Sequence, residues 1–315
     1  MKSSNRTSLW TYMPVVVLSA VFCCVLWGSA SPAIKIAYEL FRIDASDTPS
    51  RLMLSGARFV LAGVMVIIFG SLISREALIP KKTSWKYIII LSMFQTIGQY
   101  YFFFMSLANT SGVRGSIINA SGNFLAPLIA MFILRLEAPA AKKLIGCAVG
   151  FAGIILFFGG ISSLTEGGIT FAGEGAMLCA ALFYAISGCC IKIFSKHENP
   201  VILSGYQFFI GGLVLFFVGL IMGGSLVFYS AGCYLNLIYM GFISAGAYTL
   251  WGILLKYNPV SRVSVLGFIN PIMGVLLSAL FLGEGNEAFS AGSILSLLLV
   301  SLGIFLVNYK FEKKS

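Results

Sequence analysis

Long apolar stretches follow one another along the whole chain and are separated by short polar segments. Each stretch has about 20 residues, which is the length that an α-helix needs to cross a bilayer. The short alternating segments of a β-barrel do not occur. The pattern predicts an all-α polytopic membrane protein with ten transmembrane helices. The expected spans cover about residues 13–34, 52–73, 86–107, 113–134, 143–161, 171–193, 200–222, 233–255, 261–282 and 289–308.

The sequence also repeats itself. "LSGARFVLAGVMVIIFG" at 54–70 returns at 203–219 as "LSGYQFFIGGLVLFFVG", with an offset of 149 residues. The segments that begin at 98 and 246 match with an offset of 148, including Arg114 and Arg262, and those at 137 and 287 match with an offset of 150. The near-constant offset predicts two five-helix repeats, at residues 1–161 and 162–315.

Five spans are an odd number, so the second repeat has to enter the membrane from the opposite side. Inverted repeats of this kind are the architecture of secondary transporters, whose substrate site lies near the midplane between the halves. The sequence therefore favours transport by alternating access.

Charge supports the membrane topology and argues against a nucleic-acid partner. Only 10% of the 315 residues are charged, against roughly 25% in soluble domains. With the N-terminus in the cytoplasm, sixteen of the 21 Lys and Arg residues fall on the cytoplasmic side and five outside. This is the positive-inside pattern, so the net charge of +10 reports topology, and both termini are expected in the cytoplasm.

Several short motifs carry a family resemblance. "WGSASPAIK" (27–35) is similar to the W-G-x-x-x-x-x-x-K pattern of the EamA-type transporters of the drug/metabolite transporter superfamily. "ARFVLAG" (57–63) and "NPIMGVLLSALFLGE" (270–284) also resemble that family, whereas "APLIAMFILRLE" (126–137) has its proline four residues later than the repeat predicts. The resemblance implies two repeats of five helices and ATP-independent movement of small solutes, with many bacterial members that export amino acids or other metabolites across the inner membrane.

Ionisable groups inside a span are costly and usually mark function. Arg58 lies about six residues into the second span, where a guanidinium could bind a carboxylate or phosphate in bidentate fashion. The alternatives are a structural partner, such as Glu39 or a carbonyl, and snorkelling to the surface. The equivalent position in the second repeat is Gln207, so the site would be electrically asymmetric. Lys35 belongs to the family motif with Trp27 and is a candidate for a cavity or gate, or for snorkelling.

Other polar and aromatic residues in the spans are candidates to line the cavity, with interhelical hydrogen bonding or packing as the alternative. Gln95 and Gln99 are four apart on one expected helical face. Pro271 cannot donate a backbone hydrogen bond, and broken helices often line transporter sites. The candidates for substrate binding are Trp27, Lys35, Arg58, Gln95, Gln99, Tyr100, Asn119, Asn123, Gln207, Tyr248, Trp251 and Asn270.

The middle of each span lacks Asp and Glu, whereas a proton-coupled pump for cations usually needs a buried carboxylate. The sequence thus favours an anionic or zwitterionic solute, with export of amino acids or similar metabolites as the leading hypothesis. An exporter of drugs or quaternary ammonium compounds is the alternative, as is a receptor or assembly subunit that transports nothing. No metal cluster, P-loop or catalytic pair is present, so we expect neither an enzyme nor a cofactor. The expected partners are a small solute and the lipid bilayer, and both a monomer and a homodimer stay open.

Overall fold

The computed structural model describes residues 9–136, 138–157, 169–258, 263 and 266–308, and these residues form helices and connecting turns without a strand. Each of the ten predicted spans overlaps one helix or a stack of helices. The helices of the first half are α1 (Met13–Gly28), α2 (Ala30–Leu40), α3 (Thr48–Ser74), α4 (Trp85–Leu91), α5 (Gln99–Leu107), α6 (Gly112–Asn119), α7 (Gly122–Leu128) and α8 (Ala141–Phe157). Those of the second half are α10 (Ala176–Phe194), α11 (Pro200–Ile221), α12 (Ala231–Tyr257), α14 (Ile269–Leu282), α15 (Gly285–Ala288) and α16 (Ala291–Asn308). The predicted repeat boundary at 161/162 lies outside the described residues.

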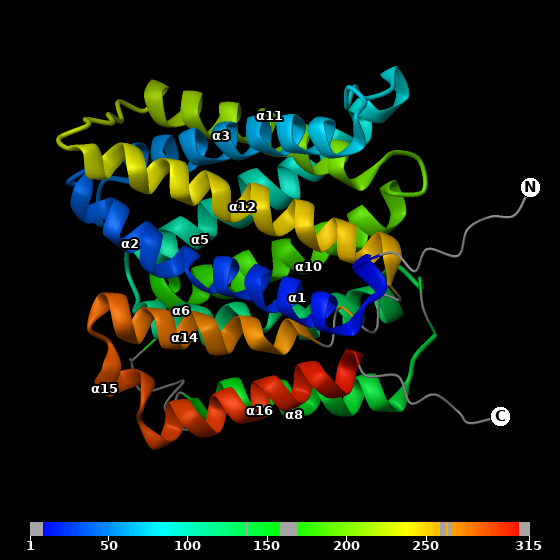
Figure 1. Cartoon of the computed structure of the whole chain (residues 1–315). Helices are drawn as coiled ribbons and strands as arrows, with labels where there is room; N and C mark the ends of the chain where they lie inside the picture. Colours follow the sequence, from blue (N-terminus) through cyan, green and yellow to red (C-terminus); the bar gives the residue numbers. More distant parts are fainter. Residues whose placement is uncertain (1–8, 137, 158–168, 259–262, 264–265, 309–315) are drawn as a thin grey trace, which may run out of the picture.

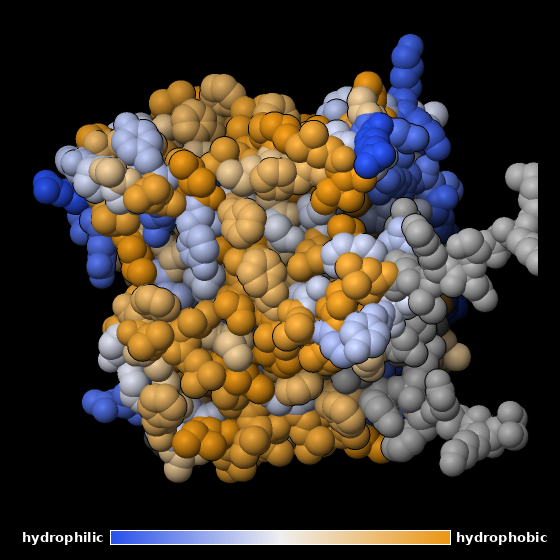
Figure 2. Space-filling view, in the orientation of Figure 1, coloured by the Kyte–Doolittle hydropathy of each residue, from blue (hydrophilic) through white to orange (hydrophobic). Residues whose placement is uncertain are grey.

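Seven helical segments among the described residues are long and apolar enough to cross a membrane. They are Met13–Leu40, Thr48–Ser74, Lys82–Leu107, Gly112–Ile133, Phe171–Phe194, Pro200–Ile221 and Ala291–Asn308. The segment Leu266–Leu282 is apolar but shorter. Figure 2 shows an apolar surface across the middle of the molecule, with the most hydrophilic residues gathered at its two ends. These features make the chain a multi-pass membrane protein, and the count of ten crossings stays a prediction.

The helices lie side by side in one bundle (Figure 1). The first residue of α1 and the last of α16 lie at the same end, which we call the terminal end. The connections 75–84 and 195–199 lie there too, while the connections 41–47, 108–111, 222–230 and 283–290 lie at the opposite, far end. Which end faces the cytoplasm is still a prediction from the Lys and Arg pattern.

The paired helices α3 and α11 begin with the same kind of N-terminal cap. The Asp47 carboxylate accepts a hydrogen bond from Ser50 N at 3.0 Å before α3, and the Asn199 side chain accepts one from Val201 N at 2.9 Å before α11. Each capping residue is followed by a proline in the first turn, which is where a helix tolerates one. The repeated segments therefore use the same local chemistry to begin the same element.

Helices α3 and α11 cross in close contact through glycines that are equivalent in the two repeats. A Cβ on Gly56 would lie 2.6 Å from the Gly212 carbonyl oxygen, and one on Gly63 would lie 2.7 Å from that of Gly205. With the offset of 149, Gly56 corresponds to Gly205 and Gly63 to Gly212, so each contact is the repeat of the other. The pairing is antiparallel, because the earlier residue of one helix meets the later residue of the other.

Helices α8 and α16 pair in the same way (Figure 1). A Cβ on Gly146 would lie 3.0 Å from the Gly303 oxygen, and one on Gly153 would lie 3.0 Å from the Ser296 oxygen. With the offset of 150, these two contacts also correspond to each other. In both pairs, α3–α11 and α8–α16, an antiparallel helix packs against its own counterpart in the other repeat. The halves are therefore related by an approximate twofold axis, as inverted repeats require.

Several of the predicted spans are not continuous α-helices. The first divides into α1 and α2 at Ser29, and the sixth begins with a π-helix, η5 (Phe171–Gly175). The third contains a π-helix, η3 (Ser92–Gly98), between α4 and α5, so Gln95 and Gln99 belong to different helical segments. The fourth breaks between α6 and α7 and ends in another π-helix, η4 (Ile129–Ile133), directly after Pro127. Such bulges are frequent at functional sites.

Candidate functional site

Arg58 is the most buried charged side chain of the described residues, with 1% of its surface exposed. It projects from α3 toward α12, where its Nε donates to the Met240 carbonyl oxygen and its Nη2 to Ser244 Oγ, both at 3.2 Å. Glu39, the carboxylate considered from the sequence, is not among its partners in the described part of the chain. The guanidinium is therefore fixed by neutral groups of the other half.

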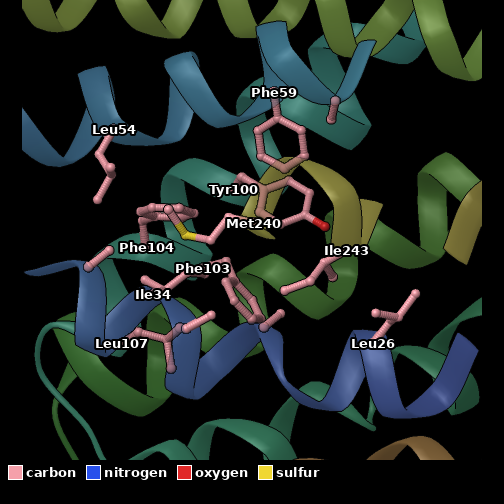
Figure 3. Close-up of a cluster of buried hydrophobic side chains, with 14 of the residues drawn as sticks. Leu26, Ile34, Leu54, Phe59, Tyr100, Phe103, Phe104, Leu107, Met240 and Ile243 are labelled. Atoms are coloured by element: carbon pink, nitrogen blue, oxygen red, sulfur yellow. The ribbon is translucent and has the colours of Figure 1, made fainter. Parts of the chain in front are cut away.

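Aromatic rings surround the rest of this guanidinium. Its carbon lies 4.9 Å from the ring centre of Phe59, 5.4 Å from Tyr100 and 6.0 Å from Phe104. In Figure 3 the rings of Phe59 and Tyr100 lie close together between α3 and α5, with Met240 beside them. Cation–π attraction stabilises a desolvated guanidinium in such a cage, but leaves its net charge uncompensated.

Gln207 on α11 occupies the position that the repeat makes equivalent to Arg58. Its Oε1 accepts a hydrogen bond of 2.5 Å from the hydroxyl of Thr96 in η3. The offset of 148 makes Thr96 the counterpart of Ser244, so the Arg58–Ser244 and Gln207–Thr96 contacts are the same interaction in the two halves. We call these two contacts the crossing bonds. They differ in charge, because only one of them contains an arginine.

Tyr248 on α12 connects the polar residues of the third span to an aromatic group on α1. Gln95 Nε2 donates to the Tyr248 hydroxyl at 3.1 Å, and the ring of Tyr248 lies 5.6 Å from Trp27. Trp27 lies 5.1 Å from Trp251, and Tyr248 also interacts with Tyr100, which contacts Arg58. Seven of the twelve predicted site residues thus adjoin one another or the crossing bonds; they are Trp27, Arg58, Gln95, Tyr100, Gln207, Tyr248 and Trp251.

Four of the buried polar atoms that lack a hydrogen-bond partner among the described residues belong to predicted site residues of this region. They are Arg58 Nη1, Gln95 Oε1, Gln99 Oε1 and Gln207 Nε2. Their side chains are at most 5% exposed. An unpaired buried donor or acceptor costs about 1–3 kcal/mol, and more when it is charged, so a group of them indicates a place where a ligand or water binds. We call the site around these atoms the central site.

The other predicted site residues are less closely tied to the central site. Asn123 on α7 bonds to the preceding turn, from Nδ2 to the Ala120 oxygen at 3.2 Å. Asn119 and Asn270 are half-buried, and Asn119 Oδ1 has no partner in the described part of the chain. Pro271 lies in the first turn of α14, directly after a 3₁₀ turn at Leu266–Phe268, so it breaks no long helix.

Lys35 lies away from Arg58, in a charged network at the far end. Its Nζ is 3.8 Å from Glu284 Oε1. Arg114 Nε donates to Glu287 Oε1 at 2.7 Å, and its Nη1 lies 3.5 Å from Glu174 Oε1. We call these five residues the far-end network. Both cations come from the first half and all three carboxylates from the second, so each ion pair ties one half to the other.

Hydrogen bonds reinforce the far-end network. The Glu284 carboxylate accepts from Gly112 N at 3.0 Å and Val113 N at 2.9 Å, at the positive N-terminal end of α6. The Thr110 hydroxyl donates to Glu174 at 2.8 Å. Beside them is an open pocket of about 380 Å³, lined by Asn109, Thr110, Ser111, Arg114, Thr170, Glu174 and Glu287. These contacts join the two halves at the far end.

At the terminal end the carboxylate of Glu198 joins the halves. Glu198 accepts hydrogen bonds from Ser84 Oγ at 2.7 Å, Asn199 N at 2.9 Å and Lys81 N at 3.1 Å. Burial raises the pKa of Glu198, but these hydrogen bonds outweigh it and hold that pKa below its ordinary value. The only histidine, His197, stacks on Tyr87 with ring centres 5.2 Å apart.

Sequence reasoning missed Thr96, Ser244 and the Met240 carbonyl as parts of the central site. The repeat offset could have found the two hydroxyls, because 96 and 244 are equivalent positions and both carry a small hydroxyl residue. It missed the far-end network because Arg114, Glu174, Glu284 and Glu287 lie near the ends of spans, where charge is ordinary. Within the described residues, no cluster of His, Cys, Asp and Glu could hold a metal ion.

Comparisons with known proteins agree with this architecture. A family model described as the EamA-like transporter family matches residues 14–159 and again 171–309. A solved structure titled "Crystal structure of protein" superposes with a TM-score of 0.63, covering 93% of this chain and 96% of that one at 19% identity. At that identity the superposition speaks for the fold alone.

Curated relatives cover nearly the full length of the chain. The WAT1-related protein At3g02690, chloroplastic, of Arabidopsis thaliana is 26% identical over 95% of this chain and 70% of its own. The "Probable amino-acid metabolite efflux pump" of Salmonella typhimurium is 25% identical over 91% of this chain and 93% of its own. The "Uncharacterized inner membrane transporter YedA" of Escherichia coli is 25% identical over 92% and 90%.

Proposed function

Because the chain belongs to the EamA-like transporter family, we propose that it is a secondary transporter that exports amino acids or similar small anionic or zwitterionic metabolites. The observation that carries the proposal is the central site. It lies where the equivalent residues Arg58 and Gln207 each form a hydrogen bond to the other half. It also contains buried polar atoms without partners among the described residues. Transporters with inverted repeats bind their solutes at such a position.

The proposed mechanism is alternating access. The far-end network closes one end of the bundle through ion pairs between the halves. Opening that end requires these pairs to separate, while the α3–α11 contact, with its close backbone approach, stays as the axis of the movement. Bound solute would contact both halves at the crossing bonds. It would thereby favour the conformational change in which one end of the bundle opens and the other closes.

The proposed location is the inner or plasma membrane, with the terminal end in the cytoplasm. This orientation puts Arg75, Lys81, Lys82, Arg135 and Lys196 on the cytoplasmic side. The YedA relative is named as an inner membrane transporter and the Salmonella relative as an efflux pump, which supports export.

The test is counterflow in liposomes that contain the purified protein. Amino acids, organic acids, nucleobases and quaternary ammonium compounds are compared, with and without a pH gradient. We expect saturable exchange of an amino or organic acid. If no compound of the panel exchanges, the proposal fails in favour of a membrane receptor or an assembly subunit.

A second candidate is export of quaternary ammonium compounds. The aromatic group of Trp27, Tyr248 and Trp251 would suit such a cation, since ring faces attract quaternary ammonium. Arg58 argues against it, because its guanidinium lies 5.4 Å from Tyr100 in the same region. Exchange of quaternary ammonium compounds alone would select this candidate.

A further inference from the structure

The charge of Arg58 has no counter-ion among the described residues. The ion pairs of that part of the chain use Lys35 and Arg114 as cations, at the far end. The groups that touch Arg58 are a carbonyl, a hydroxyl and aromatic rings, which are all neutral. A positive charge buried at 1% exposure in a membrane-spanning helix is costly unless an anion joins it.

The geometry of Arg58 limits how an anion can join. Nε and Nη2 already donate to Met240 and Ser244. The edge of the guanidinium that these two nitrogens form is therefore not available to bind both oxygens of a carboxylate. Nη1 is without a partner in the described structure. The guanidinium therefore offers its Nη1 side to a carboxylate, and the bidentate binding expected from the sequence cannot use the edge formed by Nε and Nη2.

The two unpartnered acceptors among the four atoms of the central site are neutral amide oxygens, Gln95 Oε1 and Gln99 Oε1. They can accept from the N–H of an acylated amine or from a hydroxyl. A free ammonium would need a carboxylate to balance it, and Arg58 would repel it.

From the charge balance we propose that the central site prefers a carboxylate solute of net charge −1, with a neutral N–H or O–H donor, over a zwitterionic amino acid. Such a solute forms a neutral complex with Arg58. A zwitterion leaves a complex of net charge +1, because its ammonium has no partner of opposite charge, and a dianion leaves a complex of net charge −1. The inference rests on the proposed function, because it specifies the class of solute for that same site. N-acyl amino acids and hydroxy acids belong to this class.

The experiment is counterflow at neutral pH with probes that share one body and differ in charge. Phenylalanine is the zwitterion, N-acetylphenylalanine and phenyllactate are the monoanions, and phenylalaninamide is the cation; a matched set built on alanine controls for size. We expect the monoanions to exchange at least tenfold faster than the zwitterion of the same body, and the cation to exchange slowest.

Two arginine variants test whether Arg58 causes the preference for monoanions. Arg58→Gln, which copies the residue of the second repeat, should abolish the preference for monoanions over zwitterions. Arg51→Gln is the matched control, because Arg51 is also a buried arginine of α3, at 4% exposure, but bonds to Thr48 and Asp47 at the start of its own helix. It should keep the wild-type ratio.

The outcomes separate the two proposals. Zwitterions that exchange as fast as the monoanions, or faster, overturn the charge inference and leave the transporter proposal standing. A preference for monoanions that survives in Arg58→Gln removes Arg58 as its cause and overturns the inference as well. Should Arg58→Gln fail to reach the membrane, the wild-type ratio decides alone. Lack of exchange with every probe and with the wider panel contradicts both proposals.

Discussion

Single residues decide the chemistry of the proposed central site, and Arg58 is the charged candidate that the sequence predicted there. An arginine in an apolar run, where the second repeat has Gln207, was enough to select the position. The composition of the spans did not reveal its partners, because a backbone carbonyl gives no sequence signal and the Ser244 hydroxyl stands out only when the repeat offset aligns it with Thr96. The role of Asn119 and Asn270 as residues that line the cavity stays a prediction.

Truncation of Arg58 should cripple transport. Arg58→Ala removes hydrogen bonds to Met240 and Ser244 and the proposed contact with solute, and hydrogen bonds to a charged group are worth about 1.5–3 kcal/mol each. We expect initial counterflow rates to fall at least tenfold with the protein still present in the membrane. Normal transport by this variant would take Arg58 out of the site.

The hydroxyl of Ser244 should act through Arg58. Ser244→Ala frees one donor of the guanidinium, so we expect a weaker apparent affinity for solute with a smaller change in the maximal rate. The control is Thr96→Val at the equivalent crossing bond, which contains no charge and should have the milder effect. Equal effects of the two variants on affinity would argue that the charge is irrelevant.

Glu198 should make stability depend on pH at the terminal end. Its pKa is lowered in the folded protein, so it contributes stability above its unfolded pKa of about 4.3, and that contribution is lost as the pH falls through the folded value. The melting temperature of the purified protein should therefore drop between about pH 6 and pH 3 by less in Glu198→Gln than in the wild type. A parallel drop in both proteins would refute this role.

At the scale of elements, the positions of the helices were largely predictable and their irregularities were not. Apolar runs place the helices well, because burial in lipid requires the backbone to bond within each span. The π-helices η3 and η4 were missed, since they shift hydrogen bonds without changing the apolar pattern. The break after α6 was missed for the same reason.

The contact between α3 and α11 should be intolerant of even one added carbon. Gly212→Ala would place its Cβ 2.5 Å from Val60 N, a backbone atom that cannot move aside cheaply. We expect a lower melting temperature and less protein in the membrane. Gly188→Ala on α10 is the matched control, because its Cβ would meet nothing within 4 Å and alanine is the better helix former. Similar behaviour of the two variants would contradict the close approach.

At the scale of the whole molecule, the sequence repeat predicted the relation of the halves. The offsets of 148–150 residues reappear as paired contacts, in the α3–α11 and α8–α16 crossings and in the crossing bonds. The far-end network was not predictable, because it depends on which helix ends of the two halves lie close together in space.

The far-end network should behave as a latch between the halves. Arg114→Glu and Glu287→Arg each place like charges across the 2.7 Å contact, so each should expose the far end. Ser278, which is fully buried beside Gly112, reports this as Ser278→Cys through its rate of labelling by an impermeant thiol reagent. Labelling should be fast in either single charge variant and slow again in the double exchange. A double exchange that labels as fast as the singles would rule out the latch.

The glycine crossing of α3 with α11 has the form of an isologous interface, the kind that joins two copies of one subunit about a dyad. Gly56 contacts Gly212, and their counterparts Gly205 and Gly63 contact each other in the same way. Two separate copies of the repeat could therefore form the same contact. The chain can be regarded as a fused dimer, whose covalent link guarantees one-to-one pairing and frees each copy to diverge. Arginine at 58 and glutamine at 207 are the result of that freedom: a symmetric dimer would carry two guanidinium groups or none, and only the fused chain can hold one.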